Sequence, residues 1–365
     1  MENMLRVTRE NCFDYPIVWT ESFAGLPERI RELSCKATKI CIASDTTVAA
    51  LYLQEVVSVL RPEYQVDTFV FPAGEEHKNL DTVRDFYRIL IEKHYSRKDL
   101  LLALGGGVVG DLCGFTAATY LRGIDFIQVP TTLLAQVDSS VGGKTGVDFE
   151  QFKNMVGAFH QPRLVYMNMQ TLSTLNNELF TCGMGEILKS ALIYDAAFYQ
   201  WLGEHRHEVL ARDHEALAHM VRECCRIKSE VVESDPTEQG IRAILNFGHT
   251  IGHAVEKLMH FTMLHGQCVG IGMAAAAWLS FQKGLLKDNE YQLILELNRY
   301  YGLPDHVEGL RTEDILQAMA SDKKASDGNT KFILLDRIGH AVIETLPIAS
   351  LKGAAESILK EETAH

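Results

Sequence analysis

The chain has 365 residues, of which 47% are hydrophobic and 23% are charged. This composition excludes a disordered, collagen-like or coiled-coil protein, and the length favours two domains over a single core. The formal net charge of −13 argues against broad, non-specific binding of nucleic acid or anionic membrane, although a local basic pocket for a small anion remains compatible with it.

The N-terminus and the cysteines favour a cytoplasmic protein. Residues Met1–Arg6 carry charges and lack the apolar core of a signal peptide. No apolar run reaches the length that a membrane-spanning helix needs. The eight cysteines include no CxxC pair, which favours reduced thiols over a disulfide framework. We therefore expect a soluble protein located in the cytoplasm.

Strands and helices alternate through the first half of the chain. Asp99–Leu104 is almost continuously apolar, as is typical of a strand in a parallel sheet that helices cover on both faces. Similar patterns predict strands over Lys39–Ala43, Gln65–Phe71 and Phe126–Val129, and helices over Thr47–Leu60 and Leu80–His94. This alternation indicates a doubly wound α/β domain.

From about Leu172 onward the spacing of apolar residues is helical. It predicts helices over Glu178–Leu202, Glu208–Glu233, Gly248–Leu258, Val269–Lys283 and Asn289–Tyr301, and one late strand over Lys331–Leu335. We therefore predict an α/β plus all-α protein. An N-terminal Rossmann-like parallel-sheet domain, residues 1–174, precedes a mostly helical domain, residues 175–365.

A glycine-rich loop follows the predicted strand that ends at Leu104. Gly105, Gly107 and Gly110 match the pattern G-x-G-x-x-G, in which glycines let the backbone approach a pyrophosphate at a helix N-terminus. The alternative is a tight strand-to-helix turn without a ligand. The loop lies late in the α/β half, not at its first strand. Asp45, at the end of an earlier strand, is therefore a better candidate than Asp125 for binding ribose hydroxyls.

Histidines and one carboxylate suggest a metal site in the second half. His249 and His253 are spaced i, i+4 on one helical face, His265 precedes a second apolar helix, and Glu186 lies in an apolar stretch. Ligands from separate segments, with coordination positions left open, are typical of a catalytic zinc site, and the donor set also suits iron(II). A histidine pair of this spacing is, by itself, more often a structural feature.

Basic residues also occur in apolar or glycine-rich segments. Each has an ordinary explanation as a surface charge, but in an acidic protein their number suits a small substrate with more than one negative charge. The residues are Arg122, Lys144, Lys153, Lys189, Lys228, Arg242 and the pair Lys323-Lys324.

Four segments resemble the 3-dehydroquinate synthase family. They are Gly105-Gly-Gly-Val-Val-Gly-Asp111, Tyr120-Leu-Arg-Gly123, the long run from Val129 to Gly146, and Leu245-Asn-Phe-Gly-His-Thr-Ile-Gly-His253. The resemblance extends from Asp45 to Lys324. It implies a lyase that converts 3-deoxy-D-arabino-heptulosonate 7-phosphate into 3-dehydroquinate and phosphate. The implied steps are transient oxidation by NAD, phosphate elimination, re-reduction and an intramolecular aldol closure.

The resemblance also assigns residues. It implies a divalent metal, zinc or cobalt, held by Glu186, His249 and His265, with Glu238, His253, Lys144 and Arg242 as the catalytic set. NAD contacts would fall in the first domain, on Asp45, Glu75, Lys78, Gly107, Val108, Gly110, Asp111, Thr131, Thr132, Lys153, Thr171 and Thr174. Substrate contacts would fall on Arg122, Asp138, Lys144, Asn154, Lys189, Lys228, Arg242, Asn246 and Lys324. A homodimer with Arg122 crossing the interface is implied as well.

Several other functions stay open at this point. One is another sugar-phosphate cyclase, of the aminodehydroquinate or 2-deoxy-scyllo-inosose synthase type. An inosose synthase acts on a substrate without a carboxylate and has less use for Lys228, Arg242 and Asn246. A metal-dependent polyol dehydrogenase would consume free NAD. A non-catalytic relative that binds NAD or zinc would be expected to lack catalytic residues, and none is missing here.

Overall fold

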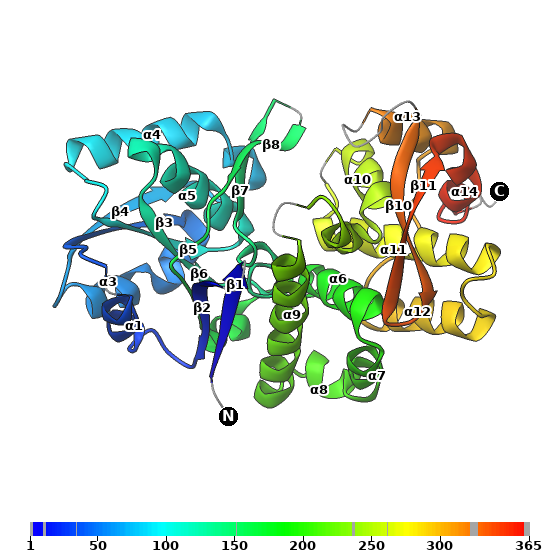
Figure 1. The fold of residues 1–365 in the computed structure, drawn as a ribbon, viewed down its shortest axis with the longest axis horizontal. Coiled ribbons are helices and arrows are strands. Elements are labelled where there is room, and N and C mark those ends of the chain that lie inside the picture. The colour runs from blue at the N-terminus through cyan, green and yellow to red at the C-terminus, as the bar shows by residue number, and fades with distance from the viewer. Residues whose placement is uncertain are drawn as a thin grey trace. The chain divides into compact units, whose positions relative to one another are not determined.

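A computed structural model describes residues 3–9, 12–33, 35–150, 152–235, 238–260, 262–321 and 328–360. The chain divides into two compact units, Met1–Leu175 and Asn176–His365. Figure 1 labels the elements of each unit. Within the described ranges, the helices are all too short or too polar to span a lipid bilayer.

The first unit is built on a seven-stranded sheet in the order β1-β2-β9-β6-β5-β3-β4. Along the run β2-β9-β6-β5-β3-β4, each strand is parallel to its neighbours. Strand β1 pairs antiparallel with β2 at one edge of the sheet. The strands are β1 (Met4–Arg9), β2 (Cys12–Thr20), β3 (Lys39–Asp45), β4 (Gln65–Phe71), β5 (Leu100–Gly105), β6 (Asp125–Pro130) and β9 (Leu164–Asn168).

Helices cover both faces of this sheet because its central strands are apolar on both sides. Along β5, Leu101 and Ala103 pack into one core with helices α4 (Leu80–Glu92) and α5 (Gly107–Thr119). The alternating residues Leu100, Leu102 and Leu104 pack into a second core with α1 (Leu26–Glu32) and α3 (Gln54–Leu60), on the opposite face (Figure 1). The predicted Rossmann-like parallel sheet is confirmed.

The strand order explains why the glycine loop lies late in the sequence. From β3 the chain moves outward to β4, and then crosses to β5 on the other side of β3 before continuing to β6. Open parallel sheets bind ligands where the strand order reverses in this way. Asp45 ends β3 and Gly105 ends β5, so these two predicted nucleotide-binding segments flank the same switch point.

A separate two-stranded hairpin packs on the first unit. Strands β7 (Lys144–Phe149) and β8 (Phe152–Phe159) pair antiparallel and contact α5. The contact is close, since a Cβ on Gly114 of α5 would lie 2.4 Å from the Cγ2 atom of Thr145. The sequence analysis did not predict this hairpin, and it also missed β1, β2 and β9.

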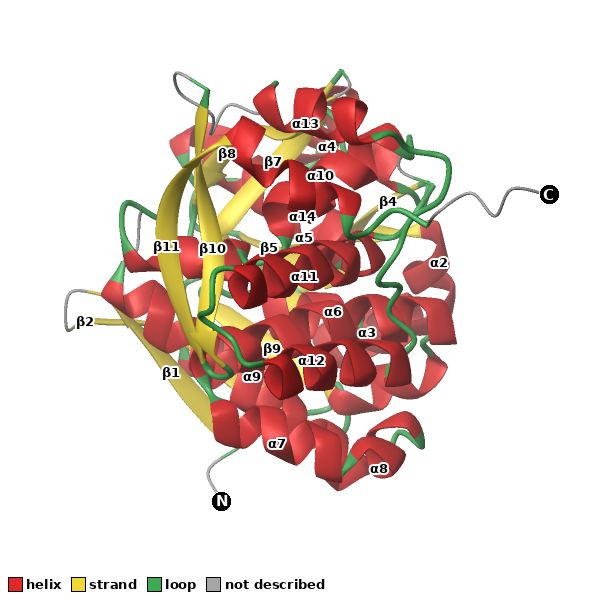
Figure 2. Ribbon diagram, turned by 90° about the vertical axis from the view of Figure 1, so that its right-hand side faces the viewer, coloured by secondary structure: helices red, strands yellow, loops and turns green. Residues whose placement is uncertain are grey.

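The second unit is mostly helical, as predicted. It contains α6 (Asn177–Tyr194), α7 (Ala196–Glu204), α8 (Arg206–Leu210), α9 (His214–Ser234), α10 (His249–Leu258), α11 (His265–Gln282), α12 (Asp288–Tyr300), α13 (Thr312–Ala320) and α14 (Lys352–Glu356). Figure 2 shows the hairpin of β10 (Asn329–Arg337) and β11 (His340–Pro347) beside these helices. The predicted late strand corresponds to β10, and its partner β11 was missed.

Two predicted helices of this unit are each broken by an aspartate. The run Glu178–Leu202 forms α6 and α7, because Asp195 adopts an extended backbone and its carboxylate caps α7 by accepting from the Phe198 amide. The run Glu208–Glu233 forms α8 and α9, with Asp213 as the N-cap of α9. Aspartate favours this position because its side chain satisfies amides that the helix leaves unpaired.

Glycines allow α11 to approach α6 and α10 closely. A Cβ on Gly266 would lie 1.9 Å from the Cys182 carbonyl oxygen of α6. A Cβ on Gly272 would lie 1.7 Å from the carbonyl oxygen of Gly248, the residue that caps α10. No side chain fits at these separations, so the three helices pack backbone against backbone and their relative positions are fixed.

We predict that Gly272→Ala lowers the free energy of unfolding by about 3 kcal/mol or more, because the added methyl group forces α10 and α11 apart. Gly203→Ala is the matched control. It lies inside α7, where the added Cβ would meet no atom within 4 Å beyond its chain neighbours and the backbone of its own helix. It should therefore change stability by less than about 1 kcal/mol, in the stabilising direction. Urea unfolding of both variants is the measurement, and equal stabilities would contradict the packing argument.

Candidate functional site

Three packed helices of the second unit direct Glu186, His249 and His265 to one point. Glu186 lies in the middle of α6 and is buried, with 1% of its surface exposed. His249 is the first residue of α10, directly after Gly248, whose φ of +78° turns the chain into the helix. His265 is the first residue of α11. Both imidazoles therefore come from helix starts that the glycine contacts hold in place.

One carboxylate oxygen is shared by the two imidazoles. Oε1 of Glu186 lies 3.4 Å from Nε2 of His249 and 3.3 Å from Nε2 of His265. The other ring nitrogens face the protein: Nδ1 of His249 is 3.1 Å from the Phe247 carbonyl oxygen, and Nδ1 of His265 is 3.5 Å from Oε2 of Glu256. This arrangement leaves both Nε2 atoms directed at the carboxylate, as in histidines that bind metals through Nε2.

The distances fit a metal ion better than a direct hydrogen bond. Oε1 is buried and makes no hydrogen bond within the described part of the chain. Donor atoms about 2.0–2.2 Å from a tetrahedral zinc ion are separated by about 3.3–3.5 Å, which is the separation found here. His253 lies close to this pair: His249, His253 and His265 each have a ring nitrogen within 4.8 Å of those of the other two. The donor set thus suits a divalent ion with room for further ligands.

Burial and neighbouring charges act together on the pKa values of Glu186, His249 and His265. Burial alone would raise the pKa of Glu186, but Lys189 and then His249 outweigh it and hold that pKa well below its usual value. Burial lowers the pKa of His249. Burial also opposes charge on His265, yet its contacts with Glu186 and Glu256 raise its pKa to about 10. Binding a metal at neutral pH therefore requires His265 to release a proton.

Glu256 is a residue of this site that the sequence analysis missed. It is buried on α10, with 4% of its surface exposed, and it contacts Nδ1 of His265. His249, His253 and Glu256 are spaced i, i+4, i+7, so they occupy one face of the helix. That spacing was the available signal. A carboxylate on the second nitrogen of a ligating histidine fixes the ring orientation and raises its basicity.

Buried cations lie near the cluster on elements that contact α6. Lys189 of α6, Lys228 of α9 and Arg242 of the short segment η6 (Ile241–Asn246) are 2%, 7% and 1% exposed. These three elements contact one another. Lys189 pairs with Oε2 of Glu186. Three buried cations on neighbouring elements concentrate positive charge in this part of the second unit, which suits a binding region for an anionic ligand.

Two further predicted residues of the second unit are joined directly. Nδ2 of Asn246 donates to Oε1 of Glu238 over 2.8 Å. Glu238 is held in a left-handed backbone conformation, with φ of +59°, in a loop that Asp235 ties by accepting from the amides of Gln239, Gly240 and Arg242. Lys324, the remaining predicted substrate contact of this unit, lies outside the described residues.

The glycine loop of the first unit fits a phosphate-bearing nucleotide. Helix α5 begins at Gly107 after the N-cap residue Gly106, and within the described residues no side chain caps its first amides. Gly110 packs against β6, where a Cβ would lie 2.7 Å from Oε1 of Gln128. Oγ1 of Thr131, directly after β6, is buried without a hydrogen-bond partner in the described ranges. Free amides at a helix start and an unsatisfied hydroxyl suit a bound pyrophosphate.

Asp45 has a structural partner of its own. Its Oδ1 atom accepts hydrogen bonds from the amides of Thr47 and Val48, and so caps the helical turn α2 (Thr46–Val48). Thr132 similarly caps the turn that contains Asp138, by accepting from the Ala135 amide. Thr171 is buried in the segment η5 (Met169–Thr174), and Thr174 lies beside Tyr52.

Lys78 connects several predicted residues of the first unit. Its Nζ atom lies 2.7 Å from Oδ2 of Asp111, 3.7 Å from Oε1 of Glu75 and 2.6 Å from Oδ1 of Asn154. Burial alone would lower the pKa of Lys78, but Asp111 and Glu75 raise it, so the ammonium group stays charged. Lys153 reaches the same region, with Nζ 4.0 Å from Oε1 of Glu75.

Arg122 and Lys144 are both exposed in the first unit, one just after a helix and the other at the start of a strand. Arg122 closes the turn after α5, and both Leu121 and Arg122 have positive φ angles, of +52° and +67°. Two consecutive non-glycine residues in this conformation are uncommon and indicate a constrained backbone. Lys144 begins β7.

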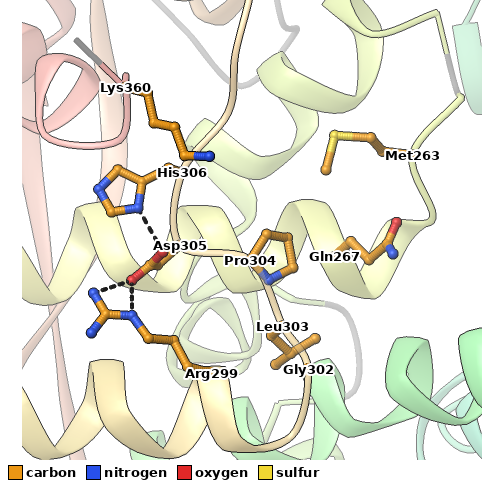
Figure 3. A pocket seen from close by; sticks show the side chains of 9 residues that line it. All are labelled: Met263, Gln267, Arg299, Gly302, Leu303, Pro304, Asp305, His306 and Lys360. Atoms are coloured by element: carbon orange, nitrogen blue, oxygen red, sulfur yellow. Dashed lines mark hydrogen bonds and ion pairs between the residues drawn. The ribbon is translucent and has the colours of Figure 1, made fainter. Parts of the chain in front are cut away.

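A pocket of about 640 Å³ in the second unit contains none of the predicted site residues (Figure 3). Its charged side chains are already paired: Asp305 contacts Arg299 over 2.5 Å and Nδ1 of His306 over 2.6 Å, and Lys360 contacts Glu308 over 2.7 Å. Gln267 lines this pocket and also accepts from the Leu264 amide at the start of α11. The pocket therefore adjoins the helix that carries His265 without sharing the cluster's donor atoms.

We predict that Glu256→Gln weakens metal binding by about tenfold to a hundredfold, since the neutral amide no longer raises the basicity of His265. Competition with a chelator of known affinity measures the effect. Glu208→Gln, an exposed residue of α8, is the matched control and should leave the affinity unchanged. Equal affinities for the two variants would show that Glu256 does not support the ligand.

Comparison with known proteins places these features in a family. Residues 68–182 match the family described as 3-dehydroquinate synthase N-terminal, and residues 183–325 match the one described as 3-dehydroquinate synthase C-terminal. The 3-dehydroquinate synthase of Acetivibrio thermocellus is 44% identical over 331 residues, which cover 90% of this chain and 91% of that protein. The 3-dehydroquinate synthase of Nitrosomonas europaea is 47% identical over 306 residues, 83% of each chain.

Solved structures share the fold. A 2-epi-5-epi-valiolone synthase from Streptomyces hygroscopicus subsp. jinggangensis 5008, with NAD+ and Zn2+ bound, has a TM-score of 0.87 and 27% identity, covering 97% of this chain and 99% of that chain. A 2-deoxy-scyllo-inosose synthase has a TM-score of 0.85 at 23% identity, over 98% of this chain and 100% of that chain, a likeness of fold alone. The family matches and the curated relatives together show that this chain belongs to the 3-dehydroquinate synthase family.

Proposed function

We propose that the chain is a 3-dehydroquinate synthase, a lyase that converts 3-deoxy-D-arabino-heptulosonate 7-phosphate into 3-dehydroquinate and phosphate. Membership of the family supports the activity. The observation that carries the proposal is the Glu186 carboxylate oxygen shared by His249 and His265. Lys189 pairs with the other oxygen, and Lys228 and Arg242 are buried on elements that contact α6. A metal site next to an anion-binding region suits a substrate that carries both hydroxyl groups and negative charges.

The two units would hold different groups. A divalent metal, zinc or cobalt, would be held by Glu186, His249 and His265 in the second unit. NAD would be bound in the first unit by the amides at the start of α5, with Asp45 at the ribose and Thr131 among the polar contacts. When bound, the metal supplies a Lewis acid that polarises substrate hydroxyls, and NAD supplies a hydride acceptor that each turnover restores. The 2-epi-5-epi-valiolone synthase binds NAD+ and Zn2+, which supports this pair.

The remaining residues of the second unit would bind and orient the substrate. Lys189, Lys228 and Arg242 present fixed positive charges from a buried position, so phosphate and carboxylate groups would be held without reorganising the protein. Asn246 holds the Glu238 carboxylate by a hydrogen bond. We assign Glu238 and His253 to proton transfer because both are titratable. Glu238 accepts from Asn246, which shares a short segment with Arg242, and His253 lies next to His249 and His265.

The substrate contacts proposed in the first unit are Arg122, Asp138, Lys144 and Asn154. We also propose that the protein forms a homodimer in which Arg122 reaches the site of the partner subunit. The paired positive φ angles of Leu121 and Arg122 support a constrained, functional turn. Sedimentation of the purified protein tests this assembly. Location in the cytoplasm stays a prediction from the sequence.

Two alternatives differ from this proposal in substrate. An inosose synthase needs no carboxylate-binding residues, whereas this chain has Arg242 and Asn246 on η6 and Lys228 on α9, which contacts η6. An aminodehydroquinate synthase would use nearly the same residues, so the choice of substrate in the assay decides between them. A non-catalytic relative that binds NAD or zinc is not favoured, because the proposed proton-transfer residues Glu238 and His253 are both present.

The proposed function predicts that phosphate is released from the heptulosonate phosphate without net formation of NADH. Phosphate release and NADH absorbance are followed together in the presence of zinc and a catalytic amount of NAD. NADH stays at baseline because the hydride returns to the substrate within each turnover, and a chelator abolishes phosphate release because the metal is removed.

Control variants and alternative substrates distinguish loss of the metal from a different enzyme activity. His249→Ala should lose metal and activity together, and Glu208→Gln should retain both. Steady NADH accumulation would indicate a polyol dehydrogenase. No phosphate from this substrate, but release from glucose 6-phosphate or from the amino analogue, would indicate another cyclase.

A further inference from the structure

A closed ring of hydrogen bonds joins Lys78, Asp148 and Asn154 in the first unit. The Asp148 amide donates to the Lys78 carbonyl oxygen over 2.8 Å. Oδ1 of Asp148 accepts from the Asn154 amide over 2.8 Å. Oδ1 of Asn154 in turn accepts from Nζ of Lys78 over 2.6 Å, which closes the ring. Asp148 is the one member of this ring that the sequence analysis did not assign to the site.

The ring lies at an irregularity of the β7–β8 hairpin. Val147 pairs with Val156 and Phe149 pairs with Phe152, so Asp148 alone opposes residues 153–155. Such a bulge leaves backbone groups without their ladder partners and turns side chains in new directions. Here the Asp148 carboxylate takes the place of the missing ladder acceptor for the Asn154 amide. The bulge presents Lys153 and Asn154, two residues proposed to bind NAD and substrate.

Asn154 needs this support because its backbone is left-handed, with φ of +53°. Asparagine tolerates that conformation better than most residues, but it remains less favourable than the extended one of a regular strand. The hydrogen bond to the Asp148 carboxylate offsets the difference. Without it, the strand pairing around Val147 and Val156 could extend, and the Asn154 side chain would turn away from Lys78.

The ring also connects the hairpin to the glycine loop. Lys78 binds Oδ2 of Asp111 over 2.7 Å, and Asp111 belongs to the first turns of α5. Asn79 and Asp148 form an isolated bridge beside this contact. The hairpin also packs on α5 through Thr145 against Gly114 and through Val147 in the shared core, and these apolar contacts do not involve the Asp148 carboxylate. Loss of the Asp148 carboxylate should therefore disturb the bulge more than the attachment of the hairpin.

We propose that Asp148 is a positioning residue, which holds Asn154 in the conformation that binds substrate. The inference rests on the proposed function for the identity of the substrate, but the ring itself is a property of the first unit. Asp148 is half-buried and acts through the Asn154 amide, so it need not touch the substrate.

The test compares Asp148→Ala with Asp148→Asn. The alanine variant removes the acceptor, and its KM for the heptulosonate phosphate should rise about tenfold or more, as expected for losing a hydrogen bond to a charged group. Its Kd for NAD should rise by a smaller factor than this, because Lys153 shares the disturbed bulge but the Lys78–Asp111 contact and the amides of α5 remain. The asparagine variant keeps an acceptor at Oδ1 and should restore the KM to within about threefold of the wild type.

Glu150→Ala is the matched control, since Glu150 lies exposed in the turn of the same hairpin. It should leave both KM and Kd unchanged. If Asp148→Ala does not fold, Asp148→Ser replaces it, because the shorter side chain stays polar but does not reach the Asn154 amide. An unchanged KM, or an equal loss of NAD and substrate binding, would overturn the proposal.

Hydrogen exchange separates failure of this inference from failure of the proposed function. Without any substrate, Asp148→Ala should speed exchange at residues 152–156 by about tenfold or more while the amides in the middle of α5 keep their protection. If this result is obtained and the wild type releases no phosphate, the role of Asp148 in holding Asn154 stands, and the proposed substrate is wrong. Unchanged exchange in an active enzyme would preserve the function and reject the role of Asp148.

Discussion

The second unit depends on a single buried carboxylate oxygen shared by two imidazoles. Oε1 of Glu186 lies within 3.4 Å of Nε2 of both His249 and His265. Each residue comes from a different helix, so the site exists only because the helices approach closely. Gly266 and Gly272 of α11 allow that approach, since neither position has room for a Cβ. Lys189 on the other carboxylate oxygen keeps Glu186 ionised, which preserves its ability to bind a cation.

The first unit achieves its proposed binding mainly through backbone groups. The reversal of strand order between β3 and β5 brings the glycine loop and Asp45 to one edge of the sheet. Uncapped amides at the start of α5 suit phosphate oxygens, and the bulge in the β7–β8 hairpin presents side chains near Lys78. The two units therefore use different chemistry: oriented amides in one, and imidazoles, a carboxylate and buried cations in the other.

Much of this organisation follows from local sequence patterns. Apolar runs predicted the central strands β3 to β6, and i, i+4 spacing predicted one face of α10. The structure brings Glu186, His249 and His265 together, although their roles as ligands stay predictions. Asp195 and Asp213 ended predicted helices because a capping carboxylate can outweigh helical periodicity.

The residues that were missed act through contacts between distant segments. Asp148 gains its role from Asn154 and from the carbonyl oxygen of Lys78, and Glu256 gains its role from His265 on the next helix. No spacing within one strand encodes the partners of Asp148, whereas the i, i+4, i+7 spacing of His249, His253 and Glu256 was a usable signal for Glu256. The hairpin itself was missed because Gly146 and Gly157 replace the alternation that marks a strand, and they are required where the two backbones meet closely.

X-ray absorption at the zinc edge tests the central claim most directly. The zinc-loaded protein should show nitrogen and oxygen donors at about 2.0–2.1 Å, with outer-shell scattering from two imidazoles and no sulfur. Glu186→Gln should lose most of the bound zinc, because the shared oxygen then carries no charge. A spectrum with three imidazoles, unchanged in Glu186→Gln, would show instead that His249, His253 and His265 hold the ion and that the Glu186 carboxylate is not its ligand.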